Sequence, residues 1–248
     1  MPDPAARRLL LFTKPARAGR VKTRLIGDLT AAQAADLHRA FVADLVDRLR
    51  GGSFGLRLAW ALDPGEDLPA ALHPGLAAVV QRGDDLGTRL HTALAEAARE
   101  APYVAALGSD HPTLPLDVVH RAFAALEAGA PVVLGPAEDG GYYLIAIAAR
   151  ALGVSEGIPR RLFEGIDWST GRVFAQTLER CRELGIEPAL LPMAADVDTP
   201  DDLRRLALRM ADGDLGCPRT RDLLATWGRL PRSAGAAAAA AASAGTRG

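Results

Sequence analysis

Short apolar runs alternate with segments of helical periodicity along most of the chain, and this alternation constrains the fold more than any other feature. Residues 9–12, 56–62, 76–80 and 104–107 are apolar runs of strand length, and a polar or Pro/Gly-rich loop follows each run. Continuous apolar strands that alternate with helices are typical of a mostly parallel sheet covered by helices on both faces. The sequence therefore predicts an α/β sandwich of three layers.

Two further apolar runs, at 132–134 and 142–147, are separated only by the short segment 135–141. A parallel crossover needs a longer connection, so the second run is expected to pair antiparallel and to make the sheet partly mixed. A last strand is expected at 187–191.

The sequence pattern predicts where the helices begin and which of their faces are buried. Thr30 and Gln33 match a capping box, and large apolar residues follow at helical spacing, at positions 37, 41, 45 and 49. Four further helices are expected, at 86–98, 116–128, 173–184 and 200–210. We expect one domain over residues 1–232, followed by an Ala-rich disordered tail at 233–248.

Composition excludes several classes of function. The net charge is −1 and aromatic residues make up 5% of the chain, which disfavours nucleic-acid binding. No run approaches the roughly 18 apolar residues of a membrane span, and the first apolar run is too short for a secretory signal. Cys181 and Cys217 lack metal-ligand spacing and fit a reduced, cytoplasmic protein. We therefore expect a cytoplasmic protein with small-molecule partners.

The loop after the first strand holds the only two lysines, Lys14 and Lys22, although the chain has 29 Lys and Arg residues in total. Lysine brings a compact charge where arginine brings a broad planar fork, so a retained lysine is suited to close contact with a phosphate. Arg17, Arg20 and Arg24 add charge to the same loop. We interpret it as a phosphate-binding loop; a solvated basic loop with coincidental lysines is the alternative.

Two other loops carry carboxylates at the ends of predicted strands. Asp110 directly follows the run at 104–107, where it can project over the edge of the sheet toward a hard cation such as Mg²⁺ or Mn²⁺. A turn or capping role before Pro112 is the alternative. Glu138 and Asp139 precede two glycines, which permit close approach of a ligand but also fit an ordinary hairpin turn.

The segment before the last predicted helix is also acidic. Thr199 fits the N-cap of that helix, and the acidic residues after Pro200 suit its first turn. Asp196 and Asp198 are not explained in this way. In an extended segment their side chains point to the same side, so together with Asp110 they are candidates for an acidic metal site.

Together these loops resemble the DUF2064 proteins of the GT-A, or nucleotide-diphospho-sugar transferase, superfamily. The resemblance runs from about residue 9 to residue 206. Besides Lys14, it rests on ordered motifs: VKTRL at 21–25, DLGTR at 85–89, GSDHP at 108–112, GPAEDGGY at 135–142, DWST at 167–170 and DVDT at 196–199. Members of this family are often labelled glycosyltransferases, some of them in arsenosugar biosynthesis. A more distant similarity links the basic loop to guanylyltransferases that activate phospholactate-type acids and to molybdenum-cofactor guanylyltransferases.

The resemblance implies a single-domain GT-A, Rossmann-like fold and a role for each matching residue. Asp110 and Asp198 match the metal-binding aspartates, and Asp139, Gly140 and Gly141 lie where an acceptor or sugar would bind. The candidate nucleotide- and phosphate-binding residues are Lys14, Arg20, Lys22, Arg24, Leu86, Gly87 and Ser109. Lys22 and Asp139 are the candidate catalytic residues, the first stabilising phosphate charge and the second acting as a base.

Two reactions fit this apparatus, and both would use Mg²⁺ or Mn²⁺. Glycosyl transfer from a nucleotide-diphospho-sugar is the first hypothesis. The alternative is nucleotidyl transfer from a nucleoside triphosphate to a small phosphate- or carboxylate-bearing acceptor, with release of pyrophosphate; the five cations of the basic loop favour it. A nucleotide-binding module without catalysis is disfavoured, because Asp110, Asp196 and Asp198 are all present.

Overall fold

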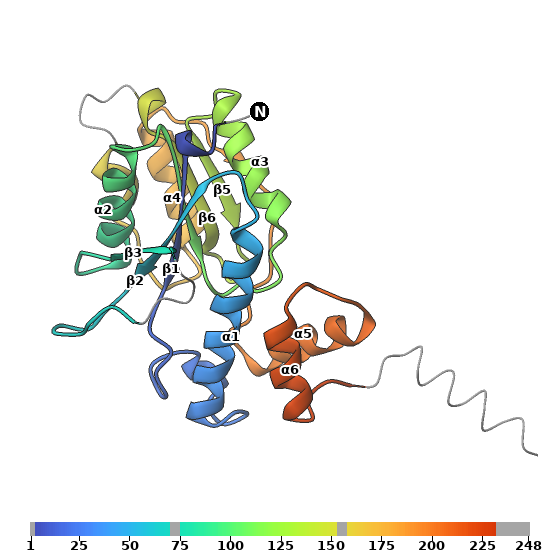
Figure 1. Cartoon of the computed structure of the whole chain (residues 1–248). Coiled ribbons are helices and arrows are strands. Elements are labelled where there is room, and N and C mark those ends of the chain that lie inside the picture. The colour runs from blue at the N-terminus through green and yellow to red at the C-terminus, as the bar shows by residue number, and fades with distance from the viewer. Residues whose placement is uncertain (1–2, 70–74, 153–157, 232–248) are drawn as a thin grey trace, which may run out of the picture. The chain divides into compact units, whose positions relative to one another are not determined.

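The computed structural model describes residues 3–69, 75–152 and 158–231 of the chain (Figure 1). Contacts divide the chain into two compact units that are discontinuous in sequence. The first unit comprises residues 1–15 and 47–196, and the second comprises residues 16–46 and 197–248. The expected tail at 233–248 lies outside the described residues, and the expected domain boundaries stay a prediction.

Within the described ranges, seven strands form one sheet, which belongs to the first unit. In spatial order the strands are β3 (Ala77–Val80), β2 (Gly55–Trp60), β1 (Arg7–Thr13), β4 (Tyr103–Gly108), β6 (Tyr142–Ala148), β5 (Val132–Pro136) and β7 (Ala189–Leu190). β6 pairs antiparallel with β4 and β5, whereas the other neighbouring strands pair parallel. The mostly parallel, partly mixed sheet is therefore confirmed, including its antiparallel strand.

Helices cover both faces of this sheet. α2 (Leu86–Ala98) and α4 (Val173–Glu183) lie on one face, and α3 (Leu116–Glu127) lies on the other (Figure 1). Successive residues of a strand point to opposite faces. Leu10 and Phe12 accordingly pack in one core cluster with Leu94 of α2, whereas Leu9 and Leu11 are buried on the opposite face. The unit also contains short 3₁₀ helices at Pro4–Ala6, Ala149–Leu152 and Arg160–Phe163.

The second unit is helical where it is described. It contains the 3₁₀ turn Thr23–Leu25, α5 (Pro200–Asp212), α6 (Pro218–Thr226) and α1 (Ala31–Leu49) up to Val46. Its core includes Leu37 and Phe41 of α1, which are fully buried among apolar residues of α5 and α6. Asp44 of α1, also buried, accepts hydrogen bonds from the backbone N–H groups of Arg219 and Thr220 at 3.1 and 2.9 Å. This carboxylate from a distant segment therefore caps the first turn of α6.

Most of the expected elements are present, with small differences at their ends. Both local caps are confirmed: Thr30 and Gln33 exchange hydrogen bonds of 3.1 and 2.9 Å, and Thr199 forms a capping box with Asp202. The strand expected at 187–191 is reduced to two residues in β7, and α6 was not expected. Among the residues that the structure describes, no helix combines the length and the apolar character that a membrane span requires.

Candidate functional site

The polar loops of the first unit meet at one edge of the sheet. In the register of the parallel strands, Phe12 of β1 lies beside Gly108 of β4, and Trp60 of β2 lies beside Val80 of β3. The loops that follow these strands therefore leave from the same edge. Because β6 runs antiparallel, the turn that precedes it reaches this edge as well. The topology thus gathers Lys14, Leu86, Gly87, Ser109, Asp110 and the turn at 137–141, which we call the carboxyl edge.

An arginine side chain forms hydrogen bonds with the backbone of the loop after β4. Arg48 donates hydrogen bonds to the carbonyl oxygens of Pro112 and Leu114, at 2.6 and 3.0 Å. Within this loop Ser109 and His111 are buried, and Asp110 is half-buried. The loop therefore holds Asp110 at the end of a buried strand, where the sequence predicted a carboxylate, while Lys14 lies exposed after β1.

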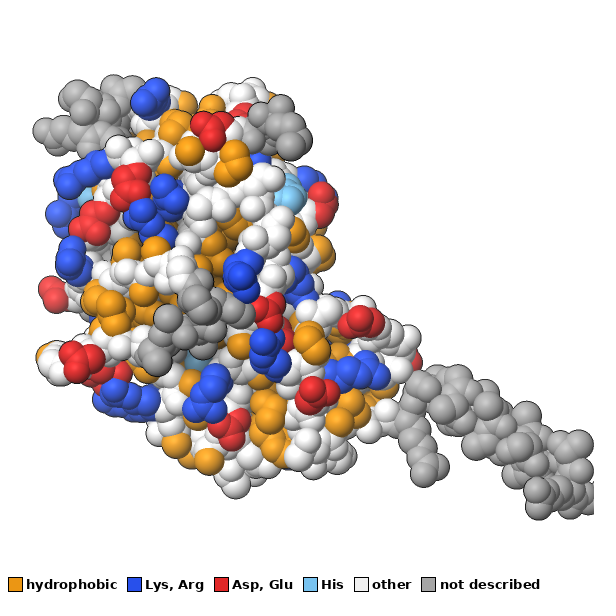
Figure 2. Space-filling model, viewed as in Figure 1, with side chains coloured by type: hydrophobic (Ala, Val, Ile, Leu, Met, Phe, Trp, Pro, Cys, Tyr) orange, Lys and Arg blue, Asp and Glu red, His pale blue; other side chains and the backbone are white. Residues whose placement is uncertain are grey.

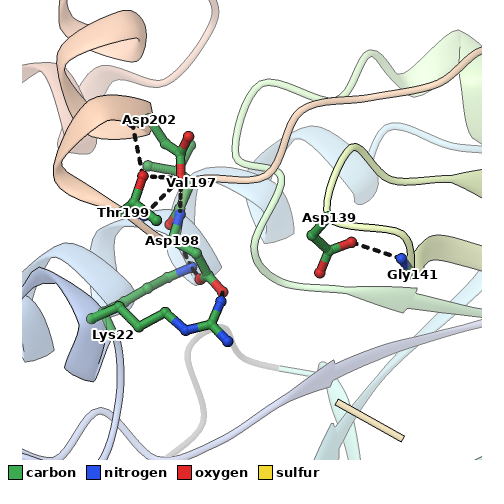
Figure 3. A network of polar contacts seen from close by, with 8 residues as sticks. Lys22, Asp139, Gly141, Val197, Asp198, Thr199 and Asp202 are labelled. Carbon is green, nitrogen blue, oxygen red and sulfur yellow. Dashed lines mark hydrogen bonds and ion pairs between the residues drawn. The ribbon is translucent and has the colours of Figure 1, made fainter. Parts of the chain in front are cut away.

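Asp139 is hydrogen-bonded to the backbone of the turn before β6. Its Oδ1 atom accepts a hydrogen bond of 2.8 Å from the backbone N–H of Gly141 (Figure 3). Gly140 has a φ of 85°, and a Cβ atom there would lie 2.2 Å from the carbonyl oxygen of Gly171. The Gly140 carbonyl oxygen in turn accepts a hydrogen bond of 2.9 Å from the N–H of Phe174. The segment is thus a tight hairpin turn held against residues 171–174, and Asp139 remains exposed at its tip.

The start of α2 forms part of a pocket in the first unit. Asp85 is the N-cap, and its Oδ1 accepts a hydrogen bond of 2.7 Å from the N–H of Thr88, which lowers the pKa of Asp85 below its ordinary value. A Cβ atom at Gly87 would lie 2.5 Å from Nε1 of Trp168 and 2.7 Å from the carbonyl oxygen of Phe163. Glycine therefore lets the segment around Trp168 approach α2 closely.

The pocket has a volume of about 160 Å³. It lies between the start of α2 and residues 160–168, a segment with no predicted site residue. Its lining residues are Asp85, Gly87, Thr88, His91, Arg160, Phe163, Glu164, Gly165, Ile166 and Trp168. The DWST motif at 167–170 was the signal that could have identified this wall, because it stands among the motifs of the family resemblance.

Lys22 and Asp198, which the sequence assigned to phosphate and metal binding, form an ion pair within the second unit. The Lys22 Nζ atom donates hydrogen bonds to Asp198 Oδ1 at 2.9 Å and to the carbonyl oxygen of Val197 at 2.8 Å (Figure 3). The Lys22 side chain is 2% exposed, and its Nζ lies 5.4 Å from the centre of the Phe41 ring. Its backbone is left-handed, with a φ of 47°. In this structure each of the two candidate residues is therefore a partner of the other.

The rest of the basic loop is open to solvent. Arg17, Arg20 and Arg24 are exposed, and Arg24 lies 3.8 Å from the Asp198 carboxylate. On the face shown in Figure 2, basic and acidic side chains are interspersed. The exposed arginines and the buried lysine of this loop thus differ sharply in environment.

The predicted metal-binding residues are not grouped as the ligands of a metal ion in this structure. In the described ranges, no three or more His, Cys, Asp or Glu side chains are grouped so that they could hold a metal ion. Asp110 belongs to the first unit and Asp198 to the second. Since Asp198 accepts its hydrogen bond from Lys22, it fits a metal poorly as it stands, and a shared metal stays a prediction.

Comparisons with known proteins place the chain in a family. The family model of DUF2064, described as an uncharacterized protein conserved in bacteria, matches residues 45–170. The crystal structure of a candidate nucleotide-diphospho-sugar transferase from Desulfovibrio desulfuricans is 32% identical to the chain, with a TM-score of 0.83. The match covers 91% of this chain and 96% of that one. The protein therefore belongs to the DUF2064 family, and its fold is that of nucleotide-diphospho-sugar transferases.

More distant likenesses concern the fold alone. The inositol-1-phosphate CTP transferase of T. maritima is 13% identical, with a TM-score of 0.51, and the match covers 90% of this chain and 98% of that one. A cytidylyltransferase from Leptospira borgpetersenii is 11% identical with the same TM-score, over 91% of this chain and 96% of that one. No curated protein matches the chain.

Proposed function

We propose that the protein is a transferase that binds the phosphate groups of a nucleotide, and specifically a glycosyltransferase that uses a nucleotide-diphospho-sugar donor. The observation that carries this proposal is the carboxyl edge of the first unit, where Lys14, Asp110 and the turn bearing Asp139 meet in a fold of this transferase class. In open α/β sheets, ligands bind at this edge. A location in the cytoplasm is part of the proposal, and the two buried cysteines, which are not joined in a disulfide, fit it.

The proposed roles follow from charge and exposure. Lys14 is exposed at the end of β1 and would bind a phosphate oxygen. Arg20 and Arg24 are exposed cations of the basic loop with the same proposed task. Lys22 would join them only by leaving Asp198, so its phosphate role requires a local rearrangement of the second unit.

Asp110 is the residue best placed to ligate Mg²⁺ or Mn²⁺, because it is a half-buried carboxylate at the end of a buried strand. Such a metal would neutralise the charge that develops on the leaving phosphate. Asp139 is the candidate base of an inverting reaction. The hydrogen bond from Gly141 holds one of its oxygens, and the exposed carboxylate could take a proton from an acceptor hydroxyl.

A thermal-shift panel tests the proposal. Nucleotide sugars, nucleoside triphosphates and nucleosides are added with Mg²⁺ or Mn²⁺ to the wild-type chain, to Asp110→Asn and to Asp117→Asn. The last variant is the matched control, because Asp117 is an exposed aspartate on α3 that pairs with Arg121. Stabilisation by nucleotide sugars that Asp110→Asn loses and Asp117→Asn keeps is the expected result. If no nucleotide sugar stabilises the wild-type chain, glycosyl transfer from such a donor is wrong.

Nucleotidyl transfer is the second candidate, favoured by the exposed arginines of the basic loop, since a triphosphate carries more negative charge than a diphosphate. The products distinguish the two reactions. Release of pyrophosphate from a nucleoside triphosphate in the presence of a phosphorylated acceptor would support nucleotidyl transfer, whereas release of a nucleoside diphosphate from a nucleotide sugar would support glycosyl transfer.

A further inference from the structure

We propose that the pocket at the start of α2 is a binding site for one sugar ring, which stacks on Trp168 and hydrogen-bonds to Asp85 and Glu164. The inference deepens the proposed function and rests on it, since it names the chemical class of a substrate group. The family resemblance implies nucleotide binding for Leu86 and Gly87 but no role for Trp168, Phe163 or Glu164. These three residues form the wall opposite α2.

The size of the pocket limits what it can hold. Its volume of about 160 Å³ is on the order of five water molecules in the liquid. Sites for drug-sized ligands usually begin near 300 Å³, so a whole nucleotide sugar does not fit. A single six-membered ring is the right scale.

The aromatic wall is held in place from two sides. On one side Gly87 allows close contact with the Trp168 indole, whose Nε1 would lie only 2.5 Å from a Cβ atom at that position. On the other side the Trp168 and Tyr142 rings meet edge-on, with centroids 6.3 Å apart and planes at 83°. An indole fixed in this way offers a preorganised apolar surface, against which the C–H groups of a pyranose can pack.

The backbone beside Trp168 includes a residue in an uncommon conformation. Ser169 has a φ of 65°, a left-handed conformation that side chains other than glycine rarely adopt. The turn around it is closed by the Thr170 hydroxyl, which donates a hydrogen bond of 2.7 Å to the carbonyl oxygen of Asp167. Strained residues of this kind gather at ligand sites, where the surrounding structure maintains them.

The polar lining favours hydroxyl groups over phosphate. Asp85 and Glu164 supply carboxylate acceptors, and the single arginine, Arg160, lies 3.7 Å from Glu164. The pocket therefore has no excess of cations to attract an anion. His91 donates its Nε2 hydrogen to the carbonyl oxygen of Ile158 at 3.0 Å, which leaves Nδ1 as an acceptor in the neutral ring. Hydroxyl donors of a sugar match such a set of acceptors.

Saturation-transfer NMR on the full chain tests the inference. The probes are the methyl pyranosides of glucose, galactose and mannose, free N-acetylglucosamine, and uridine, cytidine and guanosine as competing ring types. The variants are Trp168→Ala and Glu164→Gln, the second being an exposed, nearly isosteric change that leaves packing intact. Trp227→Phe is the matched control, because Trp227 packs on the core of the second unit.

We expect at least one pyranoside to bind the wild-type chain and the Trp227→Phe variant, and to bind Trp168→Ala and Glu164→Gln at least about tenfold more weakly. Binding of nucleosides but not of sugars, equal sugar binding by all the variants, or no sugar binding at millimolar concentration would each overturn the proposal. Binding of free sugars and binding of nucleotide sugars are measured in separate experiments. The comparison distinguishes a site for the sugar ring of an acceptor from a site for the sugar ring of the nucleotide-sugar donor. If nucleotide sugars stabilise all these variants equally while no pyranoside binds, the sugar site fails and the proposed function stands. If pyranosides bind at Trp168 while no nucleotide sugar stabilises the chain, the proposed function fails and the sugar site stands.

Discussion

Replacing Lys22 by methionine should destabilise the second unit, because the buried Nζ atom makes two hydrogen bonds there, to Asp198 at 2.9 Å and to the Val197 carbonyl oxygen at 2.8 Å. Hydrogen bonds to a charged group contribute about 1.5–3 kcal/mol each. The loss should be smaller than their sum, because the Asp198 side chain is 31% exposed and water can solvate it again. We expect a decrease of about 2 kcal/mol in the free energy of unfolding.

Urea unfolding followed by far-UV circular dichroism measures this loss. Lys14→Met is the matched control, since Lys14 is the other lysine of the chain and is exposed; its substitution should change stability by less than about 0.5 kcal/mol. Asp198→Asn and the double variant complete a thermodynamic cycle. If the pair stabilises the fold, the double variant is no less stable than Lys22→Met, with a coupling of about 1–2 kcal/mol.

Unfolding and ligand-binding measurements on these variants together separate a structural role of Lys22 from a phosphate-binding role. Equal unfolding midpoints for Lys22→Met and Lys14→Met would refute the reasoning about the ion pair. A folded Lys22→Met variant that binds a nucleoside diphosphate as tightly as the wild-type chain would show that Lys22 does not contact phosphate. Weaker binding of the diphosphate, with unchanged binding of the nucleoside, would support the exchange of Asp198 for a phosphate.

Three shorter predictions concern the frame around the sites. Asp44→Ala removes the acceptor of the Arg219 N–H and of the buried Thr220 N–H, so the free energy of unfolding should fall by about 3 kcal/mol, whereas Asp44→Asn should cost less. Chemical denaturation measures both changes, and equal stability of Asp44→Ala and wild type would contradict the cap. Gly140→Ala places a Cβ atom 2.2 Å from the Gly171 carbonyl oxygen at a φ of 85°, so about 1–3 kcal/mol should be lost, and an unchanged melting temperature would rule out this close approach. The hydrogen bond from the Thr88 N–H lowers the pKa of Asp85, so the stability that the Asp85 carboxylate contributes is complete above the ordinary Asp pKa of about 3.9 and is lost as the pH falls through the lower folded-state pKa. In urea unfolding, the greater stability of wild type over Asp85→Asn should therefore shrink only below about pH 4. A stability difference that persists in stronger acid would count against this role of the carboxylate.

Features set by neighbouring residues could be predicted from the sequence, and features set by distant residues could not. The capping box predicted at Thr30 and the N-cap predicted at Thr199 depend on residues three positions away, and both are present. The antiparallel strand β6 followed from the short connection before it. By contrast, α6 receives its cap from Asp44, 176 positions before Thr220, so its local sequence has only Pro218 to indicate a start.

The candidate site shows the same division. The position of Asp110 at the end of β4 follows from the apolar run before it, and the tight turn at Asp139 follows from its glycines. The pairing of Lys22 with Asp198 spans 176 positions, and the position of Trp168 depends on Gly87 in α2, far away in the sequence. Contacts of this kind arise from packing, which periodicity and motifs do not record.

The two lysines illustrate why composition alone could not assign a role. Both stand in one basic loop, yet Lys14 is exposed in the first unit and Lys22 is almost wholly buried in the second. At position 22 the compact ammonium group fits between a carboxylate, a carbonyl oxygen and the Phe41 ring, where a planar guanidinium would need more room. The preference for lysine there is explained by packing, without any phosphate. Lys14 is exposed, and we propose an anionic ligand as the explanation for a lysine at this position in a chain that otherwise uses arginine. The phosphate-binding proposal therefore rests more firmly on Lys14 and the exposed arginines than on Lys22.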